Sequence, residues 1–282
     1  MKLLSLLRIF TLCWTLVSGM ALAEPATLRL GITPAMAHGQ YALLEEWRSY
    51  LQAKLGRPVE FIFRNSYQEH VDLMKLRKLD FSWLSAPAYL ESRPYCKLLA
   101  TPLFQGRPYE RAYLIVSADD HTTHSLLDLK GKIFAYADPS SNTGYLVPLH
   151  QLQQAGMDSG TYFRKTFFTR DHQKIVAAVA IGLADGGALS GFFWEVLDQS
   201  RPDITRQTRI VSKSAEYGMP PLVARSTLNK QDFALMQKVL LNMSTDSEGI
   251  RLLERLKLNG FAKTSDRLYR NVFLMMKREG KL

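Results

Sequence analysis

Short apolar strands alternate with helical patterns along most of this chain, and this alternation restricts its fold more than any other feature. Residues 27–32 alternate as a half-buried strand, 41–55 carry apolar residues at helical spacing, and 59–63 are apolar again. A helix capped by Ser66 and a strand at 81–84 follow. The order strand, helix, strand, helix, strand predicts an α/β fold whose sheet contains parallel strands.

A second run of the same kind begins near residue 120, and helices follow it. The expected strands lie at 133–137, 166–169, 188–190 and 209–212, and the expected helices at 125–129, 142–154, 171–181 and 192–198. From Leu228 onward the pattern is wholly helical, with segments near 230–243, 246–258 and 265–278. Two α/β runs followed by a helical tail predict two lobes, each a mixed sheet flanked by helices.

Two apolar strands bracket the second run and are expected to cross between the lobes. They lie at 112–116 and 221–224. Lobe 1 would then comprise residues 24–115 plus 222–282, and lobe 2 would comprise residues 116–221. The helical C-terminal tail is expected to return to lobe 1.

The N-terminus has the three-part layout of a secretory signal peptide. Lys2 and Arg8 precede an apolar run at 9–17, and the small-residue site Ala21-Leu22-Ala23 stands just before Glu24. The apolar run is short and contains hydroxyl residues, which argues against a membrane span. We therefore predict that residues 1–23 are a signal peptide cleaved after Ala23, and that the mature protein is exported.

The charge and the cysteines exclude several classes of protein. The chain has 36 Lys+Arg against 26 Asp+Glu, a net charge of +10, and loss of the signal peptide leaves 34 against 26, or +8. These basic residues are scattered, which is typical of a solvated surface and not of a nucleic-acid site. Only 2 cysteines are present, too few for a disulfide scaffold or a four-cysteine zinc module. Cys96, alone after processing, is expected to be a buried apolar residue.

The segment Asp138-Pro139-Ser140-Ser141-Asn142-Thr143-Gly144-Tyr145 is the sharpest local feature. It follows an expected strand and opens an expected helix. Hydroxyl, amide and glycine residues at a helix N-terminus present N–H and O–H donors to an anion, and the helix dipole favours negative charge there. The same residue types also form an ordinary capped turn, so the pattern by itself allows both interpretations.

Three further polar residues lie close to expected strand ends. Tyr67 begins the helix after 59–63, His172 follows Asp171 at a strand-to-helix junction, and Asp185 lies in the small-residue segment 184–187. Each also has an ordinary structural interpretation as a packing, capping or turn residue. Together they would face the crevice at which open α/β sheets bind ligands. Common nucleophile, metalloprotease, P-loop and dinucleotide motifs are missing, so we predict a binding protein and not an enzyme, with no metal site and no cofactor.

The order and spacing of these motifs resemble a known family over nearly the whole mature chain. The segments that carry the resemblance are 30–34 (LGITP), 67–89, 126–132 (LLDLKGK), the loop at 138–145, His172, Asp185 and 252–269. They are similar to the periplasmic phosphate/phosphite/phosphonate-binding proteins of ABC transporters, a branch of the type II solute-binding fold.

The resemblance implies a set of ligand-binding residues. Ser141, Asn142 and Thr143 would bind the oxyanion, and Tyr67 and His172 would add hydrogen bonds from opposite lobes. Asp185 falls at an aspartate of the family pattern. A tyrosine before the first crossing strand often joins the site, and either Tyr109 or Tyr113 could serve here. Asn142 stands where relatives commonly have a hydroxyl residue, so the identity of the oxyanion stays open.

The function implied by the resemblance is capture of a small phosphorus oxyanion, which is phosphate, phosphite or phosphonate. Two α/β lobes would close on the ligand, and the closed monomer would deliver it to an ABC permease. The alternative is a sensor subunit that binds the same ligand and contacts the periplasmic part of a histidine kinase.

Overall fold

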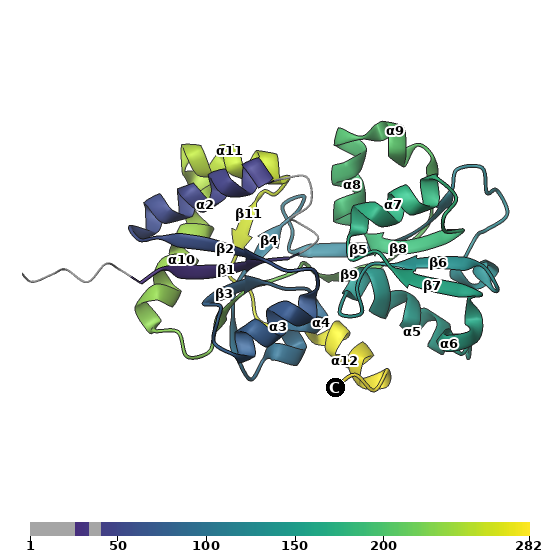
Figure 1. Ribbon diagram of the computed structural model, residues 1–282, viewed down its shortest axis with the longest axis horizontal. Helices are drawn as coiled ribbons and strands as arrows, with labels where there is room; N and C mark the ends of the chain where they lie inside the picture. The colour runs from purple at the N-terminus through teal and green to yellow at the C-terminus, as the bar shows by residue number, and fades with distance from the viewer. Residues whose placement is uncertain (1–25, 34–40) are drawn as a thin grey trace, which may run out of the picture.

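Two lobes lie side by side, each built on its own mixed sheet (Figure 1). The computed structural model describes residues 26–33 and 41–282. The predicted signal peptide, residues 1–23, lies outside the described residues. Within the described part of the chain, no helix is long and apolar enough to cross a membrane.

The first sheet has six strands in the order β11-β4-β10-β3-β1-β2. β1 pairs in parallel with β2 and β3, whereas β10 runs antiparallel to β3 and β4, and β11 antiparallel to β4. The strands are β1 (Leu28–Ile32), β2 (Val59–Phe63), β3 (Phe81–Trp83), β4 (Cys96–Leu103), β10 (Leu222–Arg225) and β11 (Gly260–Ala262).

Helices cover both faces of the first sheet (Figure 1). On one face are α2 (Tyr41–Leu55), α10 (Lys230–Asn242) and α11 (Ser247–Leu256), and on the other are α3 (Tyr67–Lys75), α4 (Ala86–Ser92) and α12 (Arg270–Arg278). Trp47, on α2, is fully buried, and its ring contacts Phe61, Trp83 and Phe261. Two short 3₁₀ turns, η3 (Met243–Thr245) and η4 (Asp266–Tyr269), lie in the C-terminal part.

The second sheet has five strands in the order β7-β6-β8-β5-β9. β6 pairs in parallel with β7 and β8, and β5 pairs antiparallel with β8 and β9. The strands are β5 (Tyr109–Ser117), β6 (Ile133–Tyr136), β7 (Lys165–Phe168), β8 (Gly186–Ser190) and β9 (Thr208–Gly218). One face packs on α7 (His172–Ala180), α8 (Gly191–Ser200) and α9 (Pro202–Thr205), and the other on η1 (Leu126–Leu129), α5 (Val147–Gln154) and α6 (Ser159–Tyr162).

These two mixed sheets with flanking helices confirm the predicted α/β architecture. Helix α2 spans Tyr41–Leu55, as the periodicity predicts. The C-terminal part is not wholly helical, however, because β11 adds a three-residue strand to the edge of the first sheet at Leu103, Pro102 and Thr101. Helix α3 ends at Lys75, three residues earlier than expected.

The chain passes between the lobes twice. The predicted division at residue 115 falls inside β5, whose residues pair within the second sheet from Tyr109 onward. We therefore propose that the first passage lies at residues 104–108 and the second at 219–221. A further contact joins the lobes where Nδ1 of His150, on α5, lies 2.9 Å from Oε1 of Glu279, just after α12.

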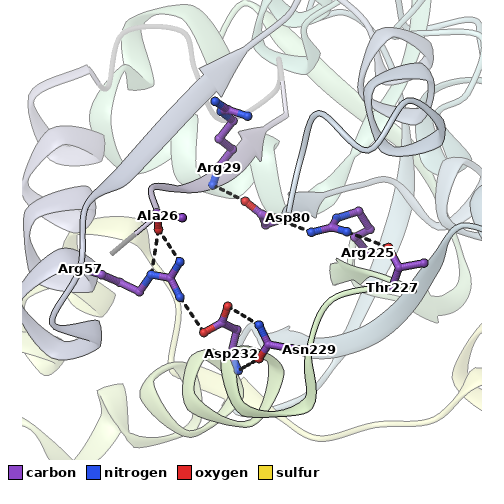
Figure 2. Close-up of polar contacts among 8 residues, drawn as sticks. All are labelled: Ala26, Arg29, Arg57, Asp80, Arg225, Thr227, Asn229 and Asp232. Carbon is purple, nitrogen blue, oxygen red and sulfur yellow. Dashed lines mark hydrogen bonds and ion pairs between the residues drawn. The ribbon is translucent and has the colours of Figure 1, made fainter. Parts of the chain in front are cut away.

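A polar network holds the end of the first sheet at which β1 and β3 begin (Figure 2). Asp80 accepts a hydrogen bond from the backbone N–H of Arg29 at 2.9 Å and one from the guanidinium of Arg225 at 2.9 Å. Arg57 donates to Asp232 at 2.7 Å and to the carbonyl of Ala26. These partly buried charges are paired, so the network ties β1, β3, β10 and α10 together.

Candidate functional site

The loop after β6 presents polar side chains that are almost fully buried. Ser141, Asn142 and Thr143 are each 2% exposed. Asp138 organises the loop, since its carboxylate accepts the N–H of Ser140 at 2.8 Å and pairs with Arg170 at 2.7 Å. These contacts of Asp138 fix the start of the loop, directly before Ser141.

A single turn of π-helix, η2 (Asn142–Leu146), carries these residues into α5. The Ser141 hydroxyl caps this turn by accepting the N–H of Gly144 at 3.0 Å. Among the described residues, neither the oxygen nor the nitrogen of the Asn142 side-chain amide has a hydrogen-bond partner, although both atoms are buried. Buried polar groups are nearly always paired in folded proteins, so this amide is a strong candidate for a ligand contact.

His172 lies directly beside the loop. A β-carbon added to Gly144 would meet Cε1 of His172 at 3.1 Å and the side chain of Ala137 at 2.4 Å, which shows how closely they pack. The ring stacks on Phe193, with centroids 5.0 Å apart. Nδ1 accepts the backbone N–H of Ser190 at 3.1 Å, so the proton of the neutral ring is on Nε2.

The protonation state of His172 follows from its burial. Burial lowers the pKa of His172 to about 3, so the ring is neutral at physiological pH. A neutral ring whose Nδ1 is occupied can offer one N–H donor at Nε2. It can therefore donate to an oxyanion without carrying a charge of its own.

Tyr67 approaches this cluster from the first lobe. It begins α3, is 4% exposed, and packs in one apolar cluster with Leu146 and Val147, which follow the loop. Burial raises the pKa of Tyr67, and the negative charges of Asp138 and Glu110 raise it further. The hydroxyl therefore stays protonated and can donate. Beside it, Ser85 of the first lobe donates to the carbonyl of Ser140 in the second.

Glu110 is a residue of this region that the sequence analysis missed. Its side chain is 6% exposed and accepts a hydrogen bond from the Ser190 hydroxyl. Burial raises the pKa of Glu110 to about 7. Ser190 thus connects Glu110, through its hydroxyl, to His172, through its N–H. The only available signal was a charged residue inside an apolar strand, at the place where a tyrosine was sought.

The structure places Asp185 at the opposite end of β6 from the loop at 141–143. Its carboxylate accepts the backbone N–H of Ile133 at 2.7 Å, at the point where β6 and β8 begin. The loop at 141–143 follows the opposite end of β6, and Ser190 is the last residue of β8. Asp185 therefore holds two strands in register at the far edge of the sheet.

The two alternative tyrosines also lie apart from the loop. Tyr109 is 36% exposed, and the Arg107 guanidinium lies over its ring at 5.2 Å. Tyr113 packs against Gly191, and its hydroxyl donates to Glu195 on α8. Side chains alternate along a strand, so Glu110 points to the opposite face of the sheet from Tyr109 and Tyr113.

No metal or redox function was found for the remaining candidates. Cys96 is buried, as expected, with its sulfur 3.3 Å from the Ser92 hydroxyl, and burial raises the pKa of its thiol to about 11. Within residues 26–33 and 41–282, no group of three His, Cys, Asp or Glu side chains could hold a metal ion. The residues at 141–143, 172, 67 and 110 carry hydroxyl, amide, imidazole, phenol and carboxyl groups, all of which form hydrogen bonds.

A family model agrees with this geometry. Residues 30–269 match the family described as the periplasmic substrate-binding protein of phosphonate ABC transporters. The chain belongs to this family. Its members are solute-binding components of transporters.

Individual relatives show how far the similarity extends. The phosphonates-binding periplasmic protein of Escherichia coli is 26% identical over 273 residues, covering 93% of this chain and 80% of the relative. A probable phosphite-binding protein of an ABC transporter from Prochlorococcus marinus is 23% identical, covering 93% of each chain. These relatives bear names that refer to different oxyanions, so membership does not fix the ligand.

Solved structures show that the fold is that of type II periplasmic binding proteins. A binding protein of an ABC phosphonate transporter from Pseudomonas aeruginosa superposes with a TM-score of 0.84 at 22% identity, covering 91% of this chain and 87% of that one. The Prochlorococcus marinus protein in complex with methylphosphonate gives a TM-score of 0.82 at 22% identity, covering 92% and 100%. The predicted fold class is thereby confirmed.

Proposed function

We propose that this protein binds a small phosphorus oxyanion between its two lobes. The observation that carries the proposal is the amide of Asn142, buried without a partner beside two buried hydroxyl residues and the neutral His172. A tetrahedral oxyanion has several acceptor oxygens and would satisfy these donors together. The relative solved with methylphosphonate supports this ligand class.

The site would bind its anion through hydrogen-bond donors that carry no charge. The N–H groups at the start of η2, the Asn142 amide, the hydroxyls of Ser141 and Thr143, and Nε2 of His172 would supply hydrogen bonds to the anion. The Tyr67 hydroxyl would complete the set from the first lobe. Hydrogen bonds to a charged group contribute about 1.5–3 kcal/mol each, so a few of them suffice for micromolar affinity.

A thermal-shift screen of the mature protein tests the proposal. The ligands are phosphate, phosphite, methylphosphonate, 2-aminoethylphosphonate and sulfate. A ligand at 100 times its dissociation constant adds about 2.7 kcal/mol of stability, which gives a clear shift. We expect at least one phosphorus oxyanion to stabilise the protein. A screen in which none does so would contradict the proposal.

We further propose that the protein delivers its ligand to an ABC permease as a monomer. Ligand contacts from both lobes would stabilise the closed form, which the permease would recognise. Solution scattering should show compaction when the best ligand from the screen is added. Uptake of that ligand by cells should require both this protein and a permease. Normal uptake in a strain that lacks this protein would count against delivery.

Processing is the last element of the proposal. We propose cleavage after Ala23, so that the periplasmic protein begins at Glu24. N-terminal sequencing of periplasmic material checks this directly. Recovery of chains that still begin at Met1 would show that the signal peptide is retained.

A further inference from the structure

Glu110 places a carboxylate where an anion is proposed to bind. It lies near the start of β5, two residues before Ala112, which pairs with Ser190 at the end of β8. From this position its side chain reaches the Ser190 hydroxyl, and the N–H of the same serine donates to His172. A single residue, Ser190, therefore links the Glu110 carboxylate to His172.

The first lobe closes over Glu110. The carboxylate is 6% exposed, and its negative charge raises the pKa of two first-lobe hydroxyls, Tyr67 and Tyr269. Among the described residues, no lysine, arginine or histidine forms an ion pair with Glu110. Within residues 26–33 and 41–282, Ser190 is the one residue that donates a hydrogen bond to it. An ionised Glu110 would therefore lie buried and uncompensated beside the proposed anion.

We propose that Glu110 is a specificity-determining residue that selects ligands able to donate a hydrogen bond to it. This inference rests on the proposed function. A carboxylate and a fully ionised oxyanion repel each other at short range, whereas a proton between them makes a strong O–H···O⁻ bond. The donor is either the acidic P–OH of a monoanion or an ammonium group on the organic substituent. Sulfate, which carries neither, would be disfavoured.

The charged and titratable groups around Glu110 form two sets. Arg107, Arg111, Glu195 and Lys213 line the same cavity as Glu110, and none of them forms an ion pair with it. Tyr67 and Tyr269 face it from α3 and η4, and burial raises the pKa of both phenols above the neutral range. His172 faces Ser190 from α7, and its pKa of about 3 keeps it neutral. Asp138 is paired with Arg170, and Asp171 caps α7. Near neutral pH, one proton is then shared between Glu110 and the ligand.

The test compares Glu110→Gln with the wild type by calorimetry from about pH 5.5 to about pH 9. The probe is methylphosphonate, whose only acidic donor is its P–OH. Wild-type affinity should fall by about tenfold per pH unit once the shared proton is lost. The amide of glutamine donates without a proton to lose. The variant should therefore bind like the wild type near the acidic end, and about tenfold or more tightly than the wild type near the alkaline end.

A second probe identifies the source of the donor. With 2-aminoethylphosphonate, an ammonium donor persists at alkaline pH. If the wild-type affinity for 2-aminoethylphosphonate stays level with pH, and the affinity of Glu110→Gln is lower at every pH, the donor is the ammonium group. If instead the wild-type affinity for this ligand falls steeply with pH, as described for methylphosphonate, and the variant removes that fall, the donor is P–OH. Both results support selection by Glu110.

The control is Glu195→Gln on α8, a half-buried glutamate that accepts from Tyr113 and lies outside the Ser190–His172 connection. It should reproduce the wild-type pH profile. A Glu110→Gln profile parallel to the wild type with both probes, and displaced by the same factor for each or not at all, would overturn the inference, because a purely structural role lowers affinity equally for both ligands at every pH. Failure of the wild type to bind any phosphorus oxyanion at any pH would instead overturn the proposed function.

Discussion

The two lobes contain the same structural unit, and comparing its copies separates scaffold from site. In the first lobe, Ser66 caps α3, Tyr67 begins it, and Asp80 follows its last residue by five positions. In the second lobe, Asp171 caps α7, His172 begins it, and Asp185 follows at the same spacing. Both helices have 9 residues.

The two aspartates have the same role. Asp80 accepts the N–H of Arg29 at 2.9 Å, and Asp185 accepts the N–H of Ile133 at 2.7 Å. In each case the backbone N–H of the aspartate returns a hydrogen bond to the carbonyl of the same partner residue at 2.9 Å. Asp185 is thus the counterpart of a scaffold residue, which explains why it lies away from the ligand site.

The two copies differ at particular positions of these helices. The first helical residue is a tyrosine in one lobe and a histidine in the other, and both are buried. One turn later, the first lobe has His70 where the second has Ile175. The shared aspartates therefore fix the strands, whereas the divergent positions give each lobe a different buried side chain.

The largest expected effect of a single substitution comes from breaking the scaffold pair. Asp80→Ala should lower the free energy of unfolding by about 3–5 kcal/mol, because it also leaves the partly buried Arg225 unpaired. Asp185→Ala, which removes one hydrogen bond to the backbone, should lower the free energy of unfolding by about 1 kcal/mol. Denaturant unfolding measures both.

Ligand affinity distinguishes this account from the earlier assignment of Asp185. Calorimetry with the best oxyanion should find Asp185→Ala within about twofold of the wild type. Asp185→Asn, which keeps an acceptor oxygen, is the matched control for stability. An Asp185→Ala protein that stays stable and loses its ligand would return Asp185 to the site.

The next effect is a loss of stability in acid. Burial lowers the pKa of His70 to about 4 and that of His172 to about 3, whereas both titrate near 6.5 when unfolded. Below about pH 6.5 the unfolded chain binds protons that the native protein does not. Stability should therefore fall as pH drops, by about 1.4 kcal/mol per pH unit for each histidine down to about pH 4.

Variants assign this acid sensitivity to individual histidines. His70→Leu should remove about half of the dependence between about pH 6.5 and about pH 4, and His172→Asn should remove a similar share. Unfolding of the ligand-free protein at several pH values gives the slopes. A free energy of unfolding that is level across this range in the wild type would show that neither histidine is held neutral.

Binding contributions from opposite lobes should be smaller and similar to each other. Tyr67→Phe and His172→Ala each remove one donor to a charged ligand, so each should weaken binding by about tenfold to a hundredfold. Calorimetry with one oxyanion measures both. A loss confined to His172→Ala would mean that the second lobe alone holds the ligand.

The smallest expected effect is at the tyrosines that the structure places away from the loop. Tyr109→Phe and Tyr113→Phe should each change the dissociation constant by less than about threefold. The same calorimetric series gives these values. A hundredfold loss for either hydroxyl would show that it reaches the ligand in the closed form.

Most of the fold was predictable because its signals are local. The apolar spacing of 41–55 and the capping of α3 by Ser66 are confirmed. The strand β11 was missed because three residues, Gly260–Ala262, carry too little periodicity to be separated from the helices around them. The limits of β5 depend on its pairing with β8 and β9, which a single sequence does not show.

The site was predictable where one segment carries it and not where the fold assembles it. Ser141, Asn142 and Thr143 are neighbours in sequence, and the structure places them together with His172 and Tyr67. Asp185 matched a family pattern, but the end of β8 at which it lies is set by the topology of the sheet. Glu110 was missed because its hydrogen bond to Ser190 joins residues far apart in the sequence, which local patterns do not show.

The central claim is that the loop after β6 holds an oxyanion, and the double variant Ser141→Ala with Thr143→Ala tests it most directly. Calorimetry with the best ligand from the screen should show a loss of about 3 kcal/mol or more, on the order of a hundredfold in dissociation constant. Folding should lose about 1 kcal/mol, because the Ser141 hydroxyl also caps η2. Near-normal affinity in a folded double variant would mean that the loop is only a turn.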